Sequence, residues 1–466
     1  MRRTWLWVPV LMAAAFAVSC GGGSSPAPPN TPFTLPPAGS TLFNLTIRDT
    51  PPVGVTILSF EVTVTEAVLH QGTTNVSVLS TPVKVEITQL ETESAFLSTK
   101  GVTPGQYDSI TVTFASPEMT IKNGSGGAIA GCAVGAICKL ESPQIGLSPA
   151  SVEFTGAPFP LNLADNTATG LLLDFNLDAS VQSDLSIQPT IGFTQLPVVE
   201  DVKEKELEGM EDLNGRVSAL GTNQFTLQVP SSGQAFIILV DSNTQFEDFG
   251  EEGLTGAFSS LKVDQVVEVN FKLNGDGSML ATKVELKEPE EGEEIEGTIT
   301  SVDSATQFTM VMLDEIPDIA GVQVGDKVTV DVTSATFRID NEELNIPSDT
   351  SFATAADLVV GQTVEVSRAS DSSGTSIVAE RVRLQTSQFT AQVKTITGSD
   401  FLVNDLSDLF TTAGITEIQV RTSLETEFDD VSGVSALSPG NKLALRGLLF
   451  NVTGTPVLVA KKVRKL

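Results

Sequence analysis

The chain has few of the residue types on which most enzymes depend. Its 466 residues include one histidine, one tyrosine, two tryptophans and three cysteines. A catalytic triad would have only His70 as its base, and a lone histidine is usually structural or exposed to solvent. No nucleophile elbow, His-Glu-x-x-His motif, P-loop or dinucleotide fingerprint is present. The sequence therefore predicts no catalytic residue and no cofactor.

Aromatic side chains suited to sugar recognition are almost absent. Sugar-binding surfaces usually rely on Trp or Tyr, whose rings join a flat apolar face to a polar group. Trp5 and Trp7 lie in the first 19 residues, so Tyr107 alone remains beyond them. The 24 phenylalanines are better explained as core residues. Asp49 and Tyr107, which lie in two N-terminal sequence motifs, are the candidate residues for a ligand surface.

Basic residues are also scarce. The chain has 27 lysines and arginines against 58 acidic residues, which gives a net charge of −31. Such a surface repels phosphate backbones, and a nucleic-acid binder should show a basic footprint. None is visible outside the last residues, 461–465. The charge therefore argues against a nucleic-acid partner.

Carboxylates are the only abundant reactive groups, and they leave two alternatives open. A hydrolase of polysaccharide or peptide would need two of them about 5–9.5 Å apart. A calcium-stabilised adhesion module would need oxygen-rich loops such as Asp241-Ser242-Asn243 or Asp340-Asn341-Glu342-Glu343. Neither loop has the Asp-x-Asp-x-Asp-Gly spacing of an EF-hand, so we predict no metal site.

The first 19 residues have the pattern of an export signal. Arg2 and Arg3 precede an apolar run over residues 5–18, which is shorter than the about 20 residues of a membrane span. The run ends in Ala17-Val18-Ser19-Cys20, which resembles a bacterial lipoprotein cleavage site, with Ala17 where leucine is usual. The resemblance implies that Cys20 carries the acyl chains of a lipoprotein, palmitate among them, and anchors the chain to a membrane.

Two cysteines remain once Cys20 carries the lipid. Cys132 and Cys138 then lie in an exported chain, and oxidising compartments favour disulfides. We predict that they form a disulfide, because no histidine or further cysteine lies nearby to complete a metal site. By resemblance to the sorting of Gram-negative lipoproteins, Gly21 in place of an aspartate after the lipidated cysteine favours the outer membrane. The predicted location is extracytoplasmic, at the periplasmic or cell-surface face of that membrane.

Composition and strand patterns divide the chain into segments. Residues 20–40 are rich in Pro, Gly and Ser and are predicted to be a tether without secondary structure. Runs of acidic residues mark the later boundaries. The predicted segments are a signal peptide (1–19), the tether (20–40), a β-sandwich domain (41–198), an acidic linker (199–213) and three β-barrel repeats (214–287, 288–386 and 387–466).

Residues 41–198 alternate between apolar and polar side chains, as in Val62-Thr63-Val64-Thr65, which is typical of half-buried strands. Turn pairs such as Asn123-Gly124 separate these runs, so many short strands predict a β-sandwich. The motifs Leu45-x-Ile47-x-Asp49-x-Pro51, Val62-x-Val64-x-x-Ala67-x-Leu69 and Pro104-Gly105-Gln106-Tyr107 resemble a bacterial family of unknown function, numbered four-three-eight-two. That resemblance implies a fold and no mechanism.

The rest of the chain repeats itself three times. Each repeat opens with a strand, continues with an aromatic strand start, and closes with a last strand. A turn of fixed spacing precedes the fourth strand, and Asp264, Gly361 and Gly440 correspond in it. The middle repeat is longest, with an insertion between Ile316 and Val324. The third predicted strand is Thr-rich and ends at Phe246, Phe337 and Phe428 in the three repeats.

Five short strands with a helical turn between the third and fourth predict a small Greek-key barrel of the oligonucleotide- and oligosaccharide-binding (OB) type. The repeats also resemble a second family of unknown function, numbered five-six-six-six, which often follows the first in exported proteins. The predicted fold class is all-β, with an N-terminal β-sandwich followed by three small five-stranded OB-like β-barrel repeats.

The predicted function follows from location and modular build. The chain is expected to be a membrane-anchored, non-catalytic binding or scaffolding module of the cell envelope. Its expected partners are the membrane, through lipidated Cys20, and an envelope or extracellular ligand. Acidic linkers are expected to hold the barrels out from the membrane as an array.

Overall fold

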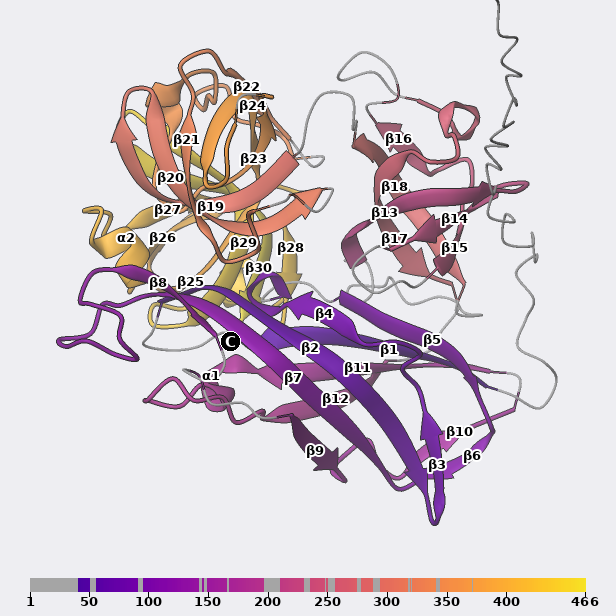
Figure 1. The fold of residues 1–466 in the computed structure, drawn as a ribbon. Coiled ribbons are helices and arrows are strands. Elements are labelled where there is room, and N and C mark those ends of the chain that lie inside the picture. The colour runs from indigo at the N-terminus through magenta and orange to yellow at the C-terminus, as the bar shows by residue number, and fades with distance from the viewer. Residues whose placement is uncertain are drawn as a thin grey trace, which may run out of the picture.

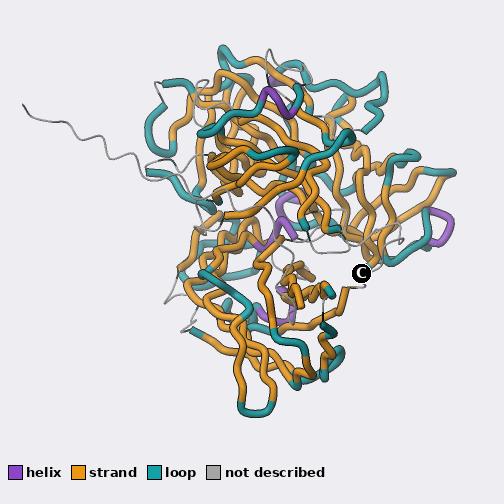
Figure 2. Tube along the Cα trace, turned by 90° about the vertical axis from the view of Figure 1, so that its right-hand side faces the viewer, coloured by secondary structure: helices purple, strands orange, loops and turns teal. Residues whose placement is uncertain are grey.

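A computed structural model gives the fold of residues 41–466 (Figure 1). The described residues have gaps at 51–55, 91–94, 142–144, 146–148, 166, 197–209, 230–234, 248, 250–255, 275–277, 288–293, 317–318, 320, 341–343 and 371. The signal, Cys20 and the tether lie outside the described residues. No described helix is long and apolar enough to cross a membrane. Strands dominate throughout, and helices are short segments between them (Figure 2).

The N-terminal domain is a sandwich of two sheets, as predicted. One sheet has four strands in the order β12-β11-β1-β5, with β1 parallel to β11. Its strands are β1 (Thr41–Thr50), β5 (Ala95–Val102), β11 (Ala168–Asn176) and β12 (Ile191–Leu196). The helix α1 (Leu177–Ser180) follows β11, and a small separate sheet pairs β6 (Gly105–Tyr107) with β10 (Leu161–Leu163).

The facing sheet has six strands in the path β3-β2-β7-β8, with β4 on β2 and β9 on β7. Its central strands, β2 and β7, are its longest. The strands are β2 (Thr56–Gln71), β3 (Thr74–Ser77), β4 (Val83–Glu86), β7 (Ser109–Lys122), β8 (Ile137–Glu141) and β9 (Ala150–Phe154), and the 3-10 turn η1 (Ile87–Leu90) follows β4.

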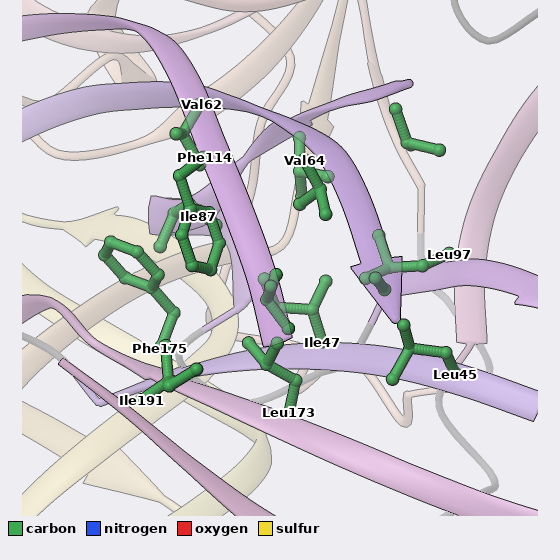
Figure 3. Packing of buried hydrophobic residues seen from close by; sticks show 14 of the residues in the cluster. Leu45, Ile47, Val62, Val64, Ile87, Leu97, Phe114, Leu173, Phe175 and Ile191 are labelled. Atoms are coloured by element: carbon green, nitrogen blue, oxygen red, sulfur yellow. The ribbon is translucent and has the colours of Figure 1, made fainter. Parts of the chain in front are cut away.

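Alternating apolar residues of the two sheets meet in one core (Figure 3). Leu45 and Ile47 of β1 face Val62 and Val64 of β2, and all four are fully buried. Ring packing between the sheets adds Phe114 and Phe175, whose centroids lie 5.3 Å apart in an edge-on arrangement. Such a period-two pattern buries one face of each sheet, which explains why these sequences form a sandwich.

Each of the three repeats closes into a five-stranded barrel, as predicted. In barrel 1, β14 and β17 flank β13, β18 pairs with β17, and a parallel pairing of β15 with β18 closes the ring. The same pairings recur as β21 with β24 in barrel 2 and β27 with β30 in barrel 3. This connectivity is that of the OB fold.

The strands and 3-10 turns of the barrels correspond one to one, and barrel 3 has the helix α2 in addition. Barrel 1 has β13 (Met210–Leu220), β14 (Gln224–Gln228), β15 (Ala235–Leu239), β16 (Gln245–Glu247), η2 (Phe258–Ser260), β17 (Val266–Leu273) and β18 (Met279–Lys287). Barrel 2 has β19 (Glu294–Ser304), β20 (Gln307–Ile316), β21 (Lys327–Asp331), β22 (Thr336–Ile339), η3 (Ala355–Asp357), β23 (Thr363–Arg368) and β24 (Ser376–Gln385). Barrel 3 has β25 (Ser387–Thr397), β26 (Asp400–Asn404), α2 (Asp408–Thr411), β27 (Ile418–Arg421), β28 (Glu427–Asp429), η4 (Val434–Ala436), β29 (Lys442–Val452) and β30 (Thr455–Lys465).

One strand assignment is corrected. The predicted third strand, which ends at Phe246, Phe337 and Phe428, is an extra short strand that pairs in parallel with the last strand. The barrel's own third strand precedes it. The extra strand was easier to detect because its phenylalanine recurs in all three repeats, whereas the outward residues of the true third strands differ between barrels.

The arrangement of the barrels also differs from the expected array. Figure 1 shows barrel 3 (yellow) lying between barrel 2 and the sandwich, so the chain folds back on itself. Barrel 1 is joined to barrel 2 by Asn214, which donates to Asp314 Oδ2 at 2.9 Å, and by Glu285, which pairs with Arg383 at 2.6 Å. We call the sandwich with barrels 2 and 3 the docked head.

Candidate functional site

The docked head is held together by equivalent loops of two barrels. The loop between the second and third strands is residues 317–326 in barrel 2 and 405–417 in barrel 3. Both contact the outer face of the six-stranded sheet of the sandwich. The corresponding loop of barrel 1, residues 229–234, is shorter. The insertion noted after Ile316 in the sequence is therefore a docking loop.

The barrel 2 loop docks through hydrogen bonds to its backbone carbonyls and through an ion pair. Thr120 Oγ1 on β7 donates to Gly325 O at 2.7 Å, and Lys139 Nζ on β8 donates to Val324 O at 2.8 Å. Lys139 also pairs with Asp326 at 3.3 Å. The ion pairs continue across the sheet, from Lys139 to Glu118, from Glu118 to Lys84 and from Lys84 to Glu61.

The barrel 3 loop docks at the neighbouring strand ends. The backbone N–H of Asp408 donates to Thr56 Oγ1 at 3.1 Å, and Lys122 Nζ donates to Thr412 Oγ1. Burial lowers the pKa of the Lys122 ammonium group, and the nearby Asp408 carboxylate opposes that shift. The Asp408 carboxylate also lies so close to Gly124 that a Cβ added there would overlap it.

Apolar residues from the three modules form a small cluster at the centre of these contacts. Leu58 of the sandwich, Val311 and Val360 of barrel 2 and Leu409 of barrel 3 are each at most 8% exposed. Leu409 lies outside barrel 3's own core cluster, so its burial depends on docking. Burying such side chains contributes about 1.5–3 kcal/mol each relative to leaving them exposed.

Barrels 2 and 3 are packed on each other as well. The β29–β30 hairpin carries Leu448, Phe450 and Val459 into the core cluster of barrel 2. Gln362 Nε2 donates to Leu449 O at 2.8 Å. Arg421 makes a two-pronged ion pair with Asp349, at 2.7 and 2.9 Å. The two barrels therefore share apolar core as well as surface contacts.

A cleft of about 310 Å³ lies where the three modules meet. The sandwich contributes residues 56–58, Thr88 and Gln89, and barrel 2 contributes residues that include Thr298 and Thr363. Barrel 3 contributes residues 388–391 of β25, the loop residues 405–410, Lys442 and Leu466. We call this space the three-module cleft.

The chemistry of the cleft is mixed. Gln388 crosses from barrel 3 to the sandwich and donates to Gln89 O at 2.8 Å. The Phe389 ring packs edge-on against Phe410 at 5.1 Å and makes an apolar floor. Hydroxyl and amide groups, two aspartates and a lysine surround that floor. The arrangement suits a small ligand with both polar and apolar parts.

Two buried carboxylates of the sandwich lie outside the cleft. Burial raises the pKa of Glu61, against the effect of its 2.5 Å ion pair with Lys84. Burial also raises the pKa of Glu86, whose two oxygens accept hydrogen bonds from Ser59 Oγ, Phe60 N and both Thr88 donors. Glu86 is thus occupied in holding β2 and η1 together.

The structure describes the side chain of only one of the two candidate ligand-surface residues. Tyr107 is fully buried, and its hydroxyl donates to Thr103 O at 2.8 Å, so its ring does not contribute to a ligand surface. A sole tyrosine beside Pro104-Gly105 serves to pack the β6–β10 sheet against the core. Asp49 lies in β1 opposite Phe175, and its side chain lies outside the described residues.

The histidine is built into the sandwich. His70 Nδ1 is 2.8 Å from Asn75 Oδ1, and Nε2 is 2.8 Å from Thr111 Oγ1. The disulfide between Cys132 and Cys138 is formed, as predicted.

Of the two candidate calcium loops, the structure fully describes only the one at Asp241-Ser242-Asn243. Asp241 Oδ1 accepts hydrogen bonds from Asn243 N and Thr244 N within its own turn, and residues 341–343 lie outside the described residues. No group of three or more His, Cys, Asp or Glu residues in the described part of the chain is placed to hold a metal.

Comparison with protein families agrees with the domain order. The family described as Domain of unknown function (DUF4382) matches residues 40–190, and the family described as Domain of unknown function (DUF5666) matches residues 214–285 and 296–383. Barrel 3 shares the strand pairings of those two matched segments although the family match ends before it. No curated protein matches the chain.

Two solved structures show a distant similarity. One is described as drosophila Unr CSD456, at 11% identity, with a TM-score of 0.14, and it covers 56% of this chain and 98% of its own. The other is a multidomain protein with nucleic acid binding domains from Streptococcus pneumoniae, at 11% identity and with a TM-score of 0.11. The match covers 53% of this chain and 71% of that protein's chain. Such TM-scores carry no argument about function. The chain thus carries one segment that matches the DUF4382 family, followed by two segments that match the DUF5666 family.

Proposed function

We propose that the chain is a non-catalytic binding and scaffolding module of the cell envelope, anchored to the outer membrane through lipidated Cys20. The observation that carries the proposal is the docked head. Its three modules are joined by apolar, hydrogen-bonded and charged contacts, and they line a shared cleft. A rigid head of this kind suits presentation of a fixed surface more than movement between independent domains.

The ligand in this proposal is an envelope or extracellular molecule. The net charge of −31 disfavours phosphate-rich partners, so nucleic acid is not proposed. A location outside the cytoplasm agrees with the Cys132–Cys138 disulfide, because such bonds persist in oxidising compartments.

The hydrolase alternative has less in its favour. A carboxylate hydrolase keeps one acid protonated beside its substrate, usually by burial. Burial raises the pKa of Glu61 and of Glu86, and neither carboxylate lines the three-module cleft. A calcium-stabilised module is likewise not proposed, because Asp241 is engaged in its own turn.

Replacing Cys20 with serine tests the anchor. We expect Cys20→Ser to move the chain from the membrane fraction to the soluble fraction, because each acyl CH₂ buried in the bilayer contributes about 0.8 kcal/mol. Fractionation of cells that express each form, followed by immunoblotting, measures this. Cys132→Ser is the matched control and should stay with the membrane. A Cys20→Ser chain that sediments like the unaltered one would overturn the proposed anchor.

A further inference from the structure

We propose that the three-module cleft binds a short zwitterionic peptide of two or three residues with free amino and carboxyl ends. The inference rests on the proposed binding function and names the ligand class for it. Four features of the cleft carry it: its size, the spacing of two charges, the groups between them, and the way three modules share it.

The size of the cleft sets the first limit. A volume of about 310 Å³ lies at the lower end of ligand pockets, which range from about 300 to 1,000 Å³. It therefore accommodates a small molecule and excludes a long polymer. The rim lies partly open, because Asp405 and Lys442 are exposed.

Two opposite charges flank the strand that makes the floor. In barrel 3, Gln392 of β25 is the register partner of both Asn404 on β26 and Lys442 on β29. Asn404 precedes Asp405, so Asp405 and Lys442 stand about two strand spacings apart, roughly 10 Å between Cα atoms. Two or three extended residues span at most about 7–11 Å, which matches that separation.

Both charged side chains are available to a ligand. Among the described residues, neither Asp405 nor Lys442 uses its side chain in a hydrogen bond or ion pair with the protein, in contrast to Asp408, which lies beside Lys122. Asp405 can accept hydrogen bonds from a peptide amino group, and Lys442 can donate to a peptide carboxylate. Of the charged side chains that line the cleft, Asp408 lies beside Lys122, which leaves Asp405 and Lys442 as the opposite charges that favour a zwitterion.

The other lining groups of the cleft suit a peptide body. Thr390 supplies a hydroxyl and Gln89 supplies an amide NH₂ group, which can pair with peptide N–H and C=O groups. Ile57 and Phe389 supply apolar surface for a side chain. Because the sandwich and barrels 2 and 3 each contribute to the lining, a bound peptide contacts all three modules and should stabilise the docked head.

Calorimetric titration with the dipeptide leucyl-leucine tests this inference on the full mature chain that carries Cys20→Ser. We expect saturable binding that N-acetylation or C-terminal amidation of the dipeptide weakens at least about tenfold, because each cap removes one charge. Asp405→Asn and Lys442→Gln should each weaken binding by a similar factor. The matched controls Asp165→Asn and Lys262→Gln change exposed residues outside the cleft and should bind as the parent does.

Three outcomes would overturn the inference: no heat at dipeptide concentrations up to about 10 mM, equal binding of capped and free dipeptides, or binding insensitive to both cleft substitutions. Sucrose, titrated in parallel, should not bind, and preferential binding of sucrose would identify a sugar site instead. Thermal melting of each variant shows that it folds. If leucyl-leucine fails while Cys20 still anchors the chain, the proposed function stands and only the ligand class is wrong.

Discussion

Leu409→Ala is expected to destabilise the docked head by about 2–5 kcal/mol, the usual cost of removing a buried leucine side chain. Leu409 is 4% exposed and contacts apolar residues of the other two modules. It does not belong to the core of its own barrel. The loss should therefore fall on docking, with barrel 3 itself still folded.

Differential scanning calorimetry measures this effect. In the parent chain, the sandwich and barrels 2 and 3 should unfold in a shared transition, and Leu409→Ala should lower its midpoint or split it. The control is Leu424→Ala in the same barrel. Leu424 is fully exposed, so its replacement should lower the free energy of unfolding by less than about 0.5 kcal/mol. Equal profiles for the two variants would mean that the modules unfold independently.

Gly361→Ala is the second change with a large expected effect. Gly361 has φ +91°, and a Cβ there would lie 2.1 Å from Cε1 of Phe410 in barrel 3. The left-handed backbone costs a side chain about 1–2 kcal/mol, and overpacking adds about 1–3 kcal/mol. Phe410 cannot easily move aside, because its ring packs against Phe389. We therefore expect a total loss of about 2–5 kcal/mol.

The repeats supply a matched control for that change. Gly440 is the equivalent residue of barrel 3, with φ +90° and no atom within 4 Å of the added Cβ. Gly440→Ala should therefore lose only the unfolding free energy that the left-handed backbone costs, about 1–2 kcal/mol. Barrel 1 has Asp264 at this position with φ +72°, which shows that the turn itself accepts a side chain. Urea unfolding should give Gly361→Ala a clearly lower free energy of unfolding than Gly440→Ala. Equal losses of unfolding free energy would contradict the packing of barrel 2 on barrel 3.

Local patterns in the sequence were sufficient for the architecture. Alternation in runs such as Val62-Thr63-Val64-Thr65 predicted the sandwich, because one buried face imposes a period of two. The turn at Asp264, Gly361 and Gly440 predicted the repeats, and all three residues hold the same left-handed backbone. The true third strands were not predicted. Only their inward-facing residues are alike in the three barrels, and a strand of four or five residues has few of them.

Those local patterns could not predict the contacts between modules. Asp405 and Lys442 are 37 positions apart in the sequence, and only the register of β25 brings them to one cleft. Leu409 looks like an ordinary apolar residue of a loop, although three modules bury it. A local sequence feature that coincides with these contacts is the insertion after Ile316, which precedes the docking residues Val324 and Gly325. Tyr107 was misjudged because residue type alone does not distinguish a buried ring from an exposed one.

The central claim is that barrels 2 and 3 fold back onto the sandwich. A disulfide between Gly124→Cys and Asp408→Cys tests it directly, because a Cβ added at Gly124 lies 3.0 Å from Asp408 Cβ. Disulfides need Cβ atoms about 3.5–4.5 Å apart, so a shift of less than about 1.5 Å suffices. With Cys20→Ser as the parent, in which Cys132 and Cys138 are paired, thiol titration under oxidising conditions should find no free thiol in the double variant and one in each single variant. Two free thiols in the folded double variant would show that the barrels stand away from the sandwich.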